Sequence, residues 1–123
     1  MKERANIGLG KAISYFLDNK YNVSIPITET QRYDLVVEKN NKLQRVECKT
    51  TSFKSPHGIP TIALKTCGGN KSGQTVKKIS SRDADILFAY DMDSSNSWII
   101  PIKEIDDMGG INLGKKYKKY MAR

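Results

Sequence analysis

Cysteine, histidine and long apolar runs are all scarce in this sequence of 123 residues. Cys48 and Cys67 stand alone without a C-x-x-C pair, which excludes a disulfide framework and a zinc knuckle and predicts two reduced thiols. The single histidine, His57, excludes a site built from several histidines, and we interpret it as part of a turn. No apolar run approaches the roughly 18 residues of a membrane span, and the charged start is not a signal peptide. These absences predict a cytoplasmic protein that does not contact a membrane.

Acidic residues are the minority among the charged ones. The chain has 13 Asp and Glu against 21 Lys and Arg, which gives a formal net charge of +8. A surplus of this sign suits a polyanionic partner, because each phosphate that a cation neutralises releases condensed counterions. The glycine-rich segment 68–72 lacks the G-x-x-x-x-G-K-[ST] order of a phosphate-binding loop. At roughly 100–200 residues per domain, we expect residues 1–123 to form a single domain.

An amphipathic helix is predicted over residues 2–19. Apolar residues recur there at the spacing that lines one face of a helix, namely Leu9, Ile13, Phe16 and Leu17. Gly8 and Gly10 each weaken such a helix by about 1 kcal/mol relative to alanine. Their presence indicates close packing or a functional role at the start of the helix. Residues 21–25 then alternate with period two, and Pro26 confines this short strand to the edge of a sheet.

A hairpin follows. Residues 31–38 and 43–50 are two runs rich in β-branched side chains, and Asn40 and Asn41 lie between them. Asparagine tolerates the positive φ that a tight turn requires, so these two residues are predicted to be the centre of the turn. The residue numbers of each opposed pair then add up to 81. Arg45 is expected across from Val36, at the rim of the hairpin.

The second half of the chain contains three more predicted strands, at 61–64, 86–90 and 98–102, with a loop before them at 52–60. Residues 66–81 are rich in glycine, serine, threonine and lysine, a composition typical of a mobile or ligand-ordered loop. Residues 115–120 are strongly basic with two interleaved tyrosines, and we expect a short helix there.

Two acids meet in the predicted hairpin. The register places Asp34 opposite Glu47, and directly opposed residues have Cβ atoms about 4.5–5.5 Å apart. Like charges at that distance are destabilising unless something compensates them, and a divalent cation would do so. Because side chains alternate along a strand, Lys49 lies on the same face as Glu47. Two carboxylates and an ammonium group therefore converge on one small patch.

This set of groups suits phosphodiester hydrolysis. Carboxylate oxygens of Asp34 and Glu47, together with the backbone carbonyl of Cys48, would hold Mg²⁺ or Mn²⁺. The metal polarises the scissile phosphate, and Lys49 orients water or neutralises the developing negative charge. In a chain with 28% charged residues the same spacing also arises by chance. The position of the two acids between apolar runs is what favours catalysis.

Three segments carry a family resemblance: residues 21–26, 31–37 and 43–50. They closely resemble the group I intron-associated branch of the PD-(D/E)XK endonuclease superfamily, and the resemblance extends through Gly68–Asn70 and Leu113–Tyr117. It implies an α/β fold with a restriction-endonuclease-like core, in which helices flank a mixed β-sheet. It also implies metal-dependent DNA cleavage, with Asp34, Glu47 and Lys49 as the motif residues. Archaeal Holliday-junction resolvases are relatives of similar size.

One residue departs from the family pattern. The family commonly carries an acid in the first helix shortly after an Ile-Gly pair, whereas Leu9 follows Ile7 and Gly8 here. Glu3 lies one helical turn before Ile7 and is our candidate for that role, although an acid is also favoured there by the helix dipole. Position 47 is glutamate where glutamine is frequent in this branch, which favours metal binding.

Candidate DNA contacts lie in three places. Gln31 and Arg32 directly precede Asp34, and Lys65, Lys71, Lys77 and Lys78 lie in or beside the glycine-rich segment. Lys115 and Lys116 begin the basic segment near the end of the chain. We interpret that segment first as a contact for the DNA backbone, then as a solvated tail, and last as a contact for anionic membrane.

The sequence therefore supports three hypotheses. The first is a Mg²⁺-dependent DNA endonuclease of homing type, working as a homodimer so that two sites reach two strands. The second is a Holliday-junction resolvase acting on branched DNA. The third is a DNA-binding module that retains the fold without cleaving, for which Leu9 in place of the usual acid is the argument.

Overall fold

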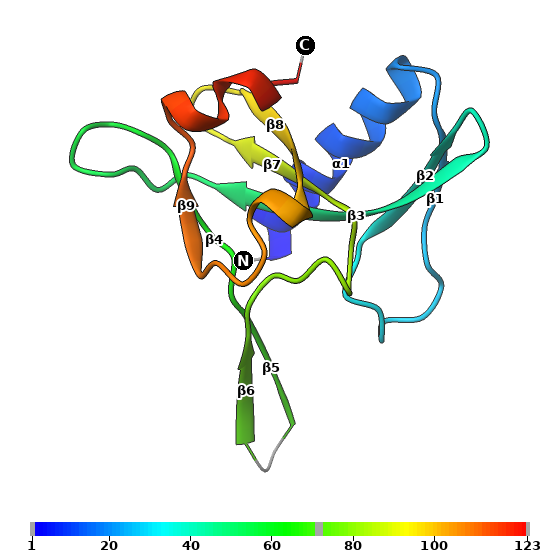
Figure 1. Ribbon diagram of the computed structural model, residues 1–123, viewed down its shortest axis with the longest axis horizontal. Coiled ribbons are helices and arrows are strands. Elements are labelled where there is room, and N and C mark those ends of the chain that lie inside the picture. Colours follow the sequence, from blue (N-terminus) through cyan, green and yellow to red (C-terminus); the bar gives the residue numbers. More distant parts are fainter. Residues whose placement is uncertain (1, 71–72, 123) are drawn as a thin grey trace.

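The computed structural model describes residues 2–70 and 73–122 of the chain. Along these residues the helices, strands and 3₁₀ helices (η) follow in the order α1 (Lys2–Asp18), β1 (Asn22–Ser24), β2 (Leu35–Lys39), β3 (Lys42–Thr51), β4 (Thr61–Ala63), β5 (Thr66–Asn70), β6 (Gly73–Lys77), β7 (Ile86–Asp91), β8 (Ser97–Pro101), η1 (Ile102–Glu104), β9 (Gly110–Asn112) and η2 (Lys115–Tyr120) (Figure 1). None of these helices has the length and apolar character that a membrane crossing requires.

Five strands form one mixed sheet in the order β1-β2-β3-β7-β8. Strands β3 and β7 run parallel, and the other neighbours are antiparallel. All six residues of β7 are buried, because the strand is covered on both faces, as an unbroken apolar run predicts. The expected mixed sheet is therefore confirmed, and β1 is the edge strand that Pro26 indicated.

Helix α1 covers one face of this sheet. Its buried side is Gly8, Ala12 and Phe16, and it packs on the face of β2, β3 and β7 that carries Leu35, Val37, Val46, Ile86, Phe88 and Tyr90. The prediction that Leu17 belongs to the buried stripe is wrong, since Leu17 is 53% exposed. The helix is turned so that Gly8 and Ala12 face the sheet, and at Gly8 the helix backbone comes close to the side chain of Thr50.

The other face of the sheet carries a second apolar core. Leu87 and Ala89 of β7 contribute to it, together with Trp98 and Ile100 of β8. The two-stranded ribbon of β4 and β9 supplies Ile62 and Ile111, and η2 supplies Tyr117. Within the described part of the chain α1 is the one α-helix, so short strands and 3₁₀ helices cover this second face.

The hairpin of β2 and β3 has the predicted register. Asn40 and Asn41 form the turn with φ values of 54° and 63°. The opposed pairs run from Lys39 and Lys42 to Leu35 and Val46, and Arg45 lies across from Val36. The prediction that residues 31–34 belong to the strand is wrong. The N–H of Cys48 donates to the side chain of Asp34, so it is not available to a backbone carbonyl of a longer β2.

The glycine-rich segment differs from its prediction as a loop. Residues 66–70 and 73–77 pair as the antiparallel strands β5 and β6, which project from the rest of the chain (Figure 1). Backbone hydrogen bonds form the ladder of such a ribbon, and residues of any type except proline can supply them. A composition poor in apolar side chains therefore hid the two strands.

The remaining expectations for the second half are confirmed. Strands occupy the predicted regions as β4, β7 and β8, and the basic segment 115–120 is helical in the 3₁₀ form. His57 lies in a turn of the loop between β3 and β4, where its N–H donates to Ser55 Oγ at 3.2 Å.

Gly8 is required where α1 crosses β3. A Cβ atom at position 8 would overlap the side-chain oxygen of Thr50, whereas a Cβ at Gly10 would meet no atom within 4 Å. We therefore expect Gly8→Ala to lower the free energy of unfolding by about 1–3 kcal/mol through overpacking. Gly10→Ala, the matched control, should raise it by up to about 1 kcal/mol through helix propensity. Urea denaturation measures both, and equal stabilities of the two variants would contradict this packing.

Candidate active site

Asp34 lies just before β2, where the pairing of β2 with β3 ends. Its N–H donates to the carbonyl of Val46 at 2.8 Å, and its Oδ2 accepts the N–H of Cys48 at 2.7 Å. The carboxyl group is therefore attached to the middle of β3 by the backbone itself. Because the N–H and C=O of a strand residue point to the same side, the carbonyl of Cys48 faces the gap that β2 leaves open.

Glu47 lies on the face of β3 opposite to α1. The residue is only 8% exposed, and its Oε2 is fully buried without a hydrogen-bond partner among the described residues. Lys49 extends from the same face, with its Nζ 3.8 Å from Glu47 Oε2. A buried acceptor without a donor is costly, on the order of 1–3 kcal/mol, so a native structure that retains one calls for an explanation.

One cavity of about 230 Å³ brings the central predicted residues together. Its lining consists of Gln31, Arg32, Asp34, Glu47, Cys48 and Lys49. The ladder stops at Leu35 and Val46, so Asp34 and Glu47 are not a paired rung of the sheet. They nevertheless line the same cavity, and the charge of Asp34 acts on Glu47.

The electrostatics of the cavity disfavour two negative charges. Burial raises the pKa of Glu47, the Lys49 ammonium lowers it, and the charge of Asp34 raises it again, with a net upward shift. Asp34 as a whole is exposed, but loss of hydration around its carboxyl group raises the pKa of that group. The Cys48 N–H and the Lys49 ammonium lower the same pKa by less, so the net shift is upward. Burial also raises the pKa of the Cys48 thiol, so this residue offers its carbonyl oxygen rather than a thiolate.

These residues fit a hard divalent cation. The orphaned Oε2 of Glu47, the Asp34 carboxylate and the carbonyl of Cys48 are oxygen ligands of the kind that Mg²⁺ prefers. The described residues contain no group of three His, Cys, Asp or Glu side chains that could hold a metal, so two carboxylates are the acidic ligands available here. Mg²⁺ usually retains several waters and needs no more than one or two carboxylates.

The other predicted site residues lie outside this cavity. Glu3 is exposed in the first turn of α1 and does not line the cavity. Lys65 directly precedes β5 and Lys78 directly follows β6, and both are exposed. Lys77 forms an ion pair with Asp83 at 3.1 Å. Lys71 lies outside the described residues.

Lys115 and Lys116 are exposed on η2, which packs on β8, two strands away from β3. Figure 1 shows η2 and the β5–β6 ribbon at opposite ends of the view. The two lysine groups predicted to contact DNA are therefore well separated.

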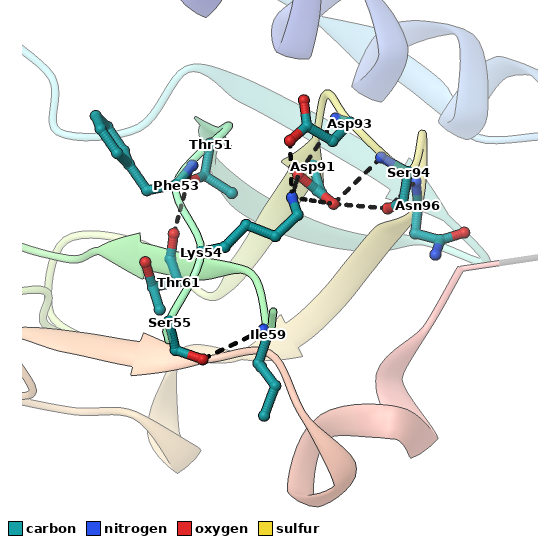
Figure 2. Close-up of polar contacts among 10 residues, drawn as sticks. All are labelled: Thr51, Phe53, Lys54, Ser55, Ile59, Thr61, Asp91, Asp93, Ser94 and Asn96. Carbon is teal, nitrogen blue, oxygen red and sulfur yellow. Dashed lines mark hydrogen bonds and ion pairs between the residues drawn. The ribbon is translucent and has the colours of Figure 1, made fainter. Parts of the chain in front are cut away.

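A polar cluster at the end of β7 was missed by sequence reasoning. Asp91, at the end of β7, is fully buried and accepts the hydroxyl of Ser94 at 2.7 Å (Figure 2). Lys54 binds Asp91 at 3.3 Å and Asp93 at 3.0 Å, which ties the loop after β3 to the end of β7. Thr51 Oγ1 donates to the carbonyl of Thr61 at 2.6 Å. An acid directly after an apolar strand, with serine three residues later, was the available signal.

The family model described as "PD-(D/E)XK endonuclease" matches residues 1–114. Among solved structures, the chain is similar to a bacterial homing endonuclease, I-Ssp6803I, with a TM-score of 0.81 and 21% sequence identity. That likeness covers 97% of this chain and 81% of the other, and it confirms the expected restriction-endonuclease-like fold. No curated protein sequence matches the chain.

The raised pKa of Glu47 predicts a pH dependence of stability. Between the ordinary value of 4.5 and the raised pKa, the folded state binds more protons than the unfolded state, so this group's contribution to stability falls as the pH rises. Glu47→Gln removes that titration. In EDTA, the free energy of unfolding of the parent should therefore fall relative to that of E47Q as the pH is raised from 4 to 8.

The matched control is Glu29→Gln, because Glu29 is an exposed glutamate outside the cavity. We expect E29Q to follow the parent across the same range. Chemical denaturation at several pH values measures all three proteins. A parent that gains stability relative to E47Q with rising pH would contradict the electrostatics described here.

Proposed function

The chain belongs to the PD-(D/E)XK endonuclease family, and from this premise we propose that it cuts double-stranded DNA in a Mg²⁺-dependent reaction at the cavity beside β3. Asp34, Glu47 and Lys49 are the proposed catalytic residues. The observation that carries the proposal is the pair of carboxyl groups in one cavity, with a Glu47 oxygen that lacks a donor and a lysine ammonium beside it.

Asp34, Glu47 and the carbonyl of Cys48 would hold the cation. When bound, the cation supplies a Lewis acid that polarises the scissile phosphate and makes water a stronger nucleophile at neutral pH. The N–H of Cys48 keeps the Asp34 carboxyl in place, because it donates to Oδ2 at 2.7 Å. That hydrogen bond fixes one ligand before substrate arrives, which is the preorganisation that catalysis requires.

Lys49 acts on the reacting phosphate. Water adds to phosphorus as the bond to the leaving oxygen breaks, and negative charge grows on the phosphoryl oxygens and on the leaving group. An ammonium group beside Glu47 is placed to offset that charge or to orient the attacking water. The pairing with Glu47 at 3.8 Å is long enough to leave hydrogen atoms of Lys49 available for substrate.

DNA as the substrate is supported by the charge of the chain and by the solved relative. The net charge of +8 favours a polyanion, and the similar bacterial protein is a homing endonuclease. We further propose a homodimer, because a single cavity of this size acts on one phosphodiester at a time and two copies reach both strands. Arg32 lines the cavity and is the proposed DNA contact closest to the cleaved bond.

Cleavage of supercoiled plasmid tests the proposed residues. With Mg²⁺ we expect Asp34→Ala, Glu47→Ala and Lys49→Ala each to reduce the cleavage rate at least about 100-fold, because each removes a charge that acts in the transition state. EDTA should abolish cleavage by the parent. Asp18→Ala and Lys103→Ala are matched controls, since both residues are exposed and outside the cavity, and they should cleave at the parent rate.

Glu3 does not line the cavity, so its catalytic role stays a prediction. We therefore include Glu3→Gln in the same series. Full activity of the three cavity variants would refute the proposed site. A parent that binds DNA tightly without any metal-dependent product would instead identify a non-catalytic binding module. Faster cleavage of four-way junctions than of matching linear duplexes would identify a resolvase.

DNA binding at several salt concentrations tests the lysines. Lys78 lies in the segment that connects β6 to Asp83, and the charge of Asp83 reaches Glu47. We therefore expect Lys65→Ala/Lys78→Ala to weaken binding more than Lys115→Ala/Lys116→Ala does. Each lost phosphate contact should reduce the slope of log affinity against log salt by about 0.9. A larger loss from the pair on η2 would show that DNA lies across the opposite end of the molecule.

A further inference from the structure

We propose that Gln31 supplies a third side-chain oxygen to the divalent cation held by Asp34 and Glu47. This inference rests on the proposed function, because it concerns the same cation. It assigns Gln31 to the metal rather than to DNA.

The orientation of the Gln31 carboxamide is fixed by a neighbour. Its nitrogen, Nε2, donates to the hydroxyl of Thr28, so the amide oxygen is the half of the group that remains available. This oxygen, Oε1, is buried and has no hydrogen-bond partner among the described residues. A contact with a base edge would need an exposed amide oxygen, which argues against a direct role in reading DNA.

Two buried acceptor oxygens without a hydrogen-bond donor belong to residues of one cavity. Gln31 Oε1 and Glu47 Oε2 are the two buried side-chain polar atoms that lack a hydrogen-bond partner in the described part of the chain. Both residues line the same cavity. Two acceptors cannot satisfy each other, so two such oxygens on residues of one cavity call for a donor or a cation in addition to the Lys49 ammonium, which lies 3.8 Å from Glu47 Oε2.

A cation accounts for both oxygens better than a trapped water does. A water could donate to the two acceptors, but it would leave the two carboxylates of the cavity repelling each other. A divalent ion satisfies the amide oxygen and offsets both negative charges at once. Amide and carbonyl oxygens are ordinary ligands of hard divalent cations, so Gln31 and the carbonyl of Cys48 would complement the two carboxylates.

Binding of Mn²⁺ in the absence of DNA tests this assignment without any reference to activity. Titrations followed by electron paramagnetic resonance give the affinity of the parent and of each variant. We expect Gln31→Ala to weaken Mn²⁺ binding at least about 10-fold, because loss of even an outer-shell partner of a metal ligand costs roughly 10–100-fold in affinity. Gln31→Glu should bind at least as tightly as the parent, because it places a third carboxylate on the ion.

Two further variants complete the design. Thr28→Val removes the hydroxyl that orients the amide, and we expect a several-fold loss of Mn²⁺ affinity while Gln31 itself remains. Gln44→Ala is the matched control, because Gln44 lies on β3 outside this cavity and should bind Mn²⁺ as the parent does. Thermal unfolding in EDTA checks that each variant is folded.

The outcomes separate this inference from the proposed function. If Q31A binds Mn²⁺ as tightly as the parent while E47Q does not bind, the Gln31 assignment is overturned and the metal site stands. The assignment is also overturned if Q31E loses as much affinity as Q31A, since an added carboxylate would then meet repulsion from Glu47 instead of a cation. If neither Asp34→Asn nor E47Q weakens Mn²⁺ binding, the proposed metal site itself fails.

Discussion

The mutual repulsion of two carboxyl groups, Asp34 and Glu47, is the constraint around which the rest of this structure is arranged. Burial and the neighbouring charge raise the pKa of Glu47, and loss of hydration raises that of Asp34. The protein compensates this only in part, through the N–H of Cys48 and the ammonium of Lys49. What remains is a cavity that disfavours two bare negative charges, and such unresolved electrostatics are typical of catalytic sites.

The scaffold keeps the two carboxyl groups from moving apart. Strand β3 carries Glu47 and is paired on one side with β2 and on the other with the fully buried β7. Helix α1 presses on the opposite face through Gly8, so β3 cannot shift toward the helix. Beyond the site, Lys54 and Asp91 tie the chain that leaves β3 to the end of β7 (Figure 2). Glu47, Cys48 and Lys49 therefore lie on a strand that is held on both sides, and the Cys48 N–H ties Asp34 to it, which suits the positioning of a cation and a phosphate.

The sequence predicted the part of the site that depends on local rules. Two asparagines with positive φ set the turn, the turn set the register, and the alternation of a strand placed Glu47 and Lys49 on one face. The chain around Asp34 could not be predicted in this way, because a side-chain hydrogen bond to Cys48 ends the ladder one residue early. Thr28 and Gln31 lie in irregular backbone, where no periodicity indicates which atoms turn inward. The β5–β6 ribbon and the Asp91 cluster depend on backbone pairing and on contacts between distant segments, which composition does not reveal.

The most direct test of a cation shared by Asp34 and Glu47 is anomalous diffraction from a crystal soaked in Mn²⁺. A shared cation predicts one anomalous peak in the cavity, bonded to carboxylate oxygens of Asp34 and Glu47 and to the carbonyl of Cys48. A cavity without a peak at saturating Mn²⁺, or a peak bonded to other residues alone, would contradict it.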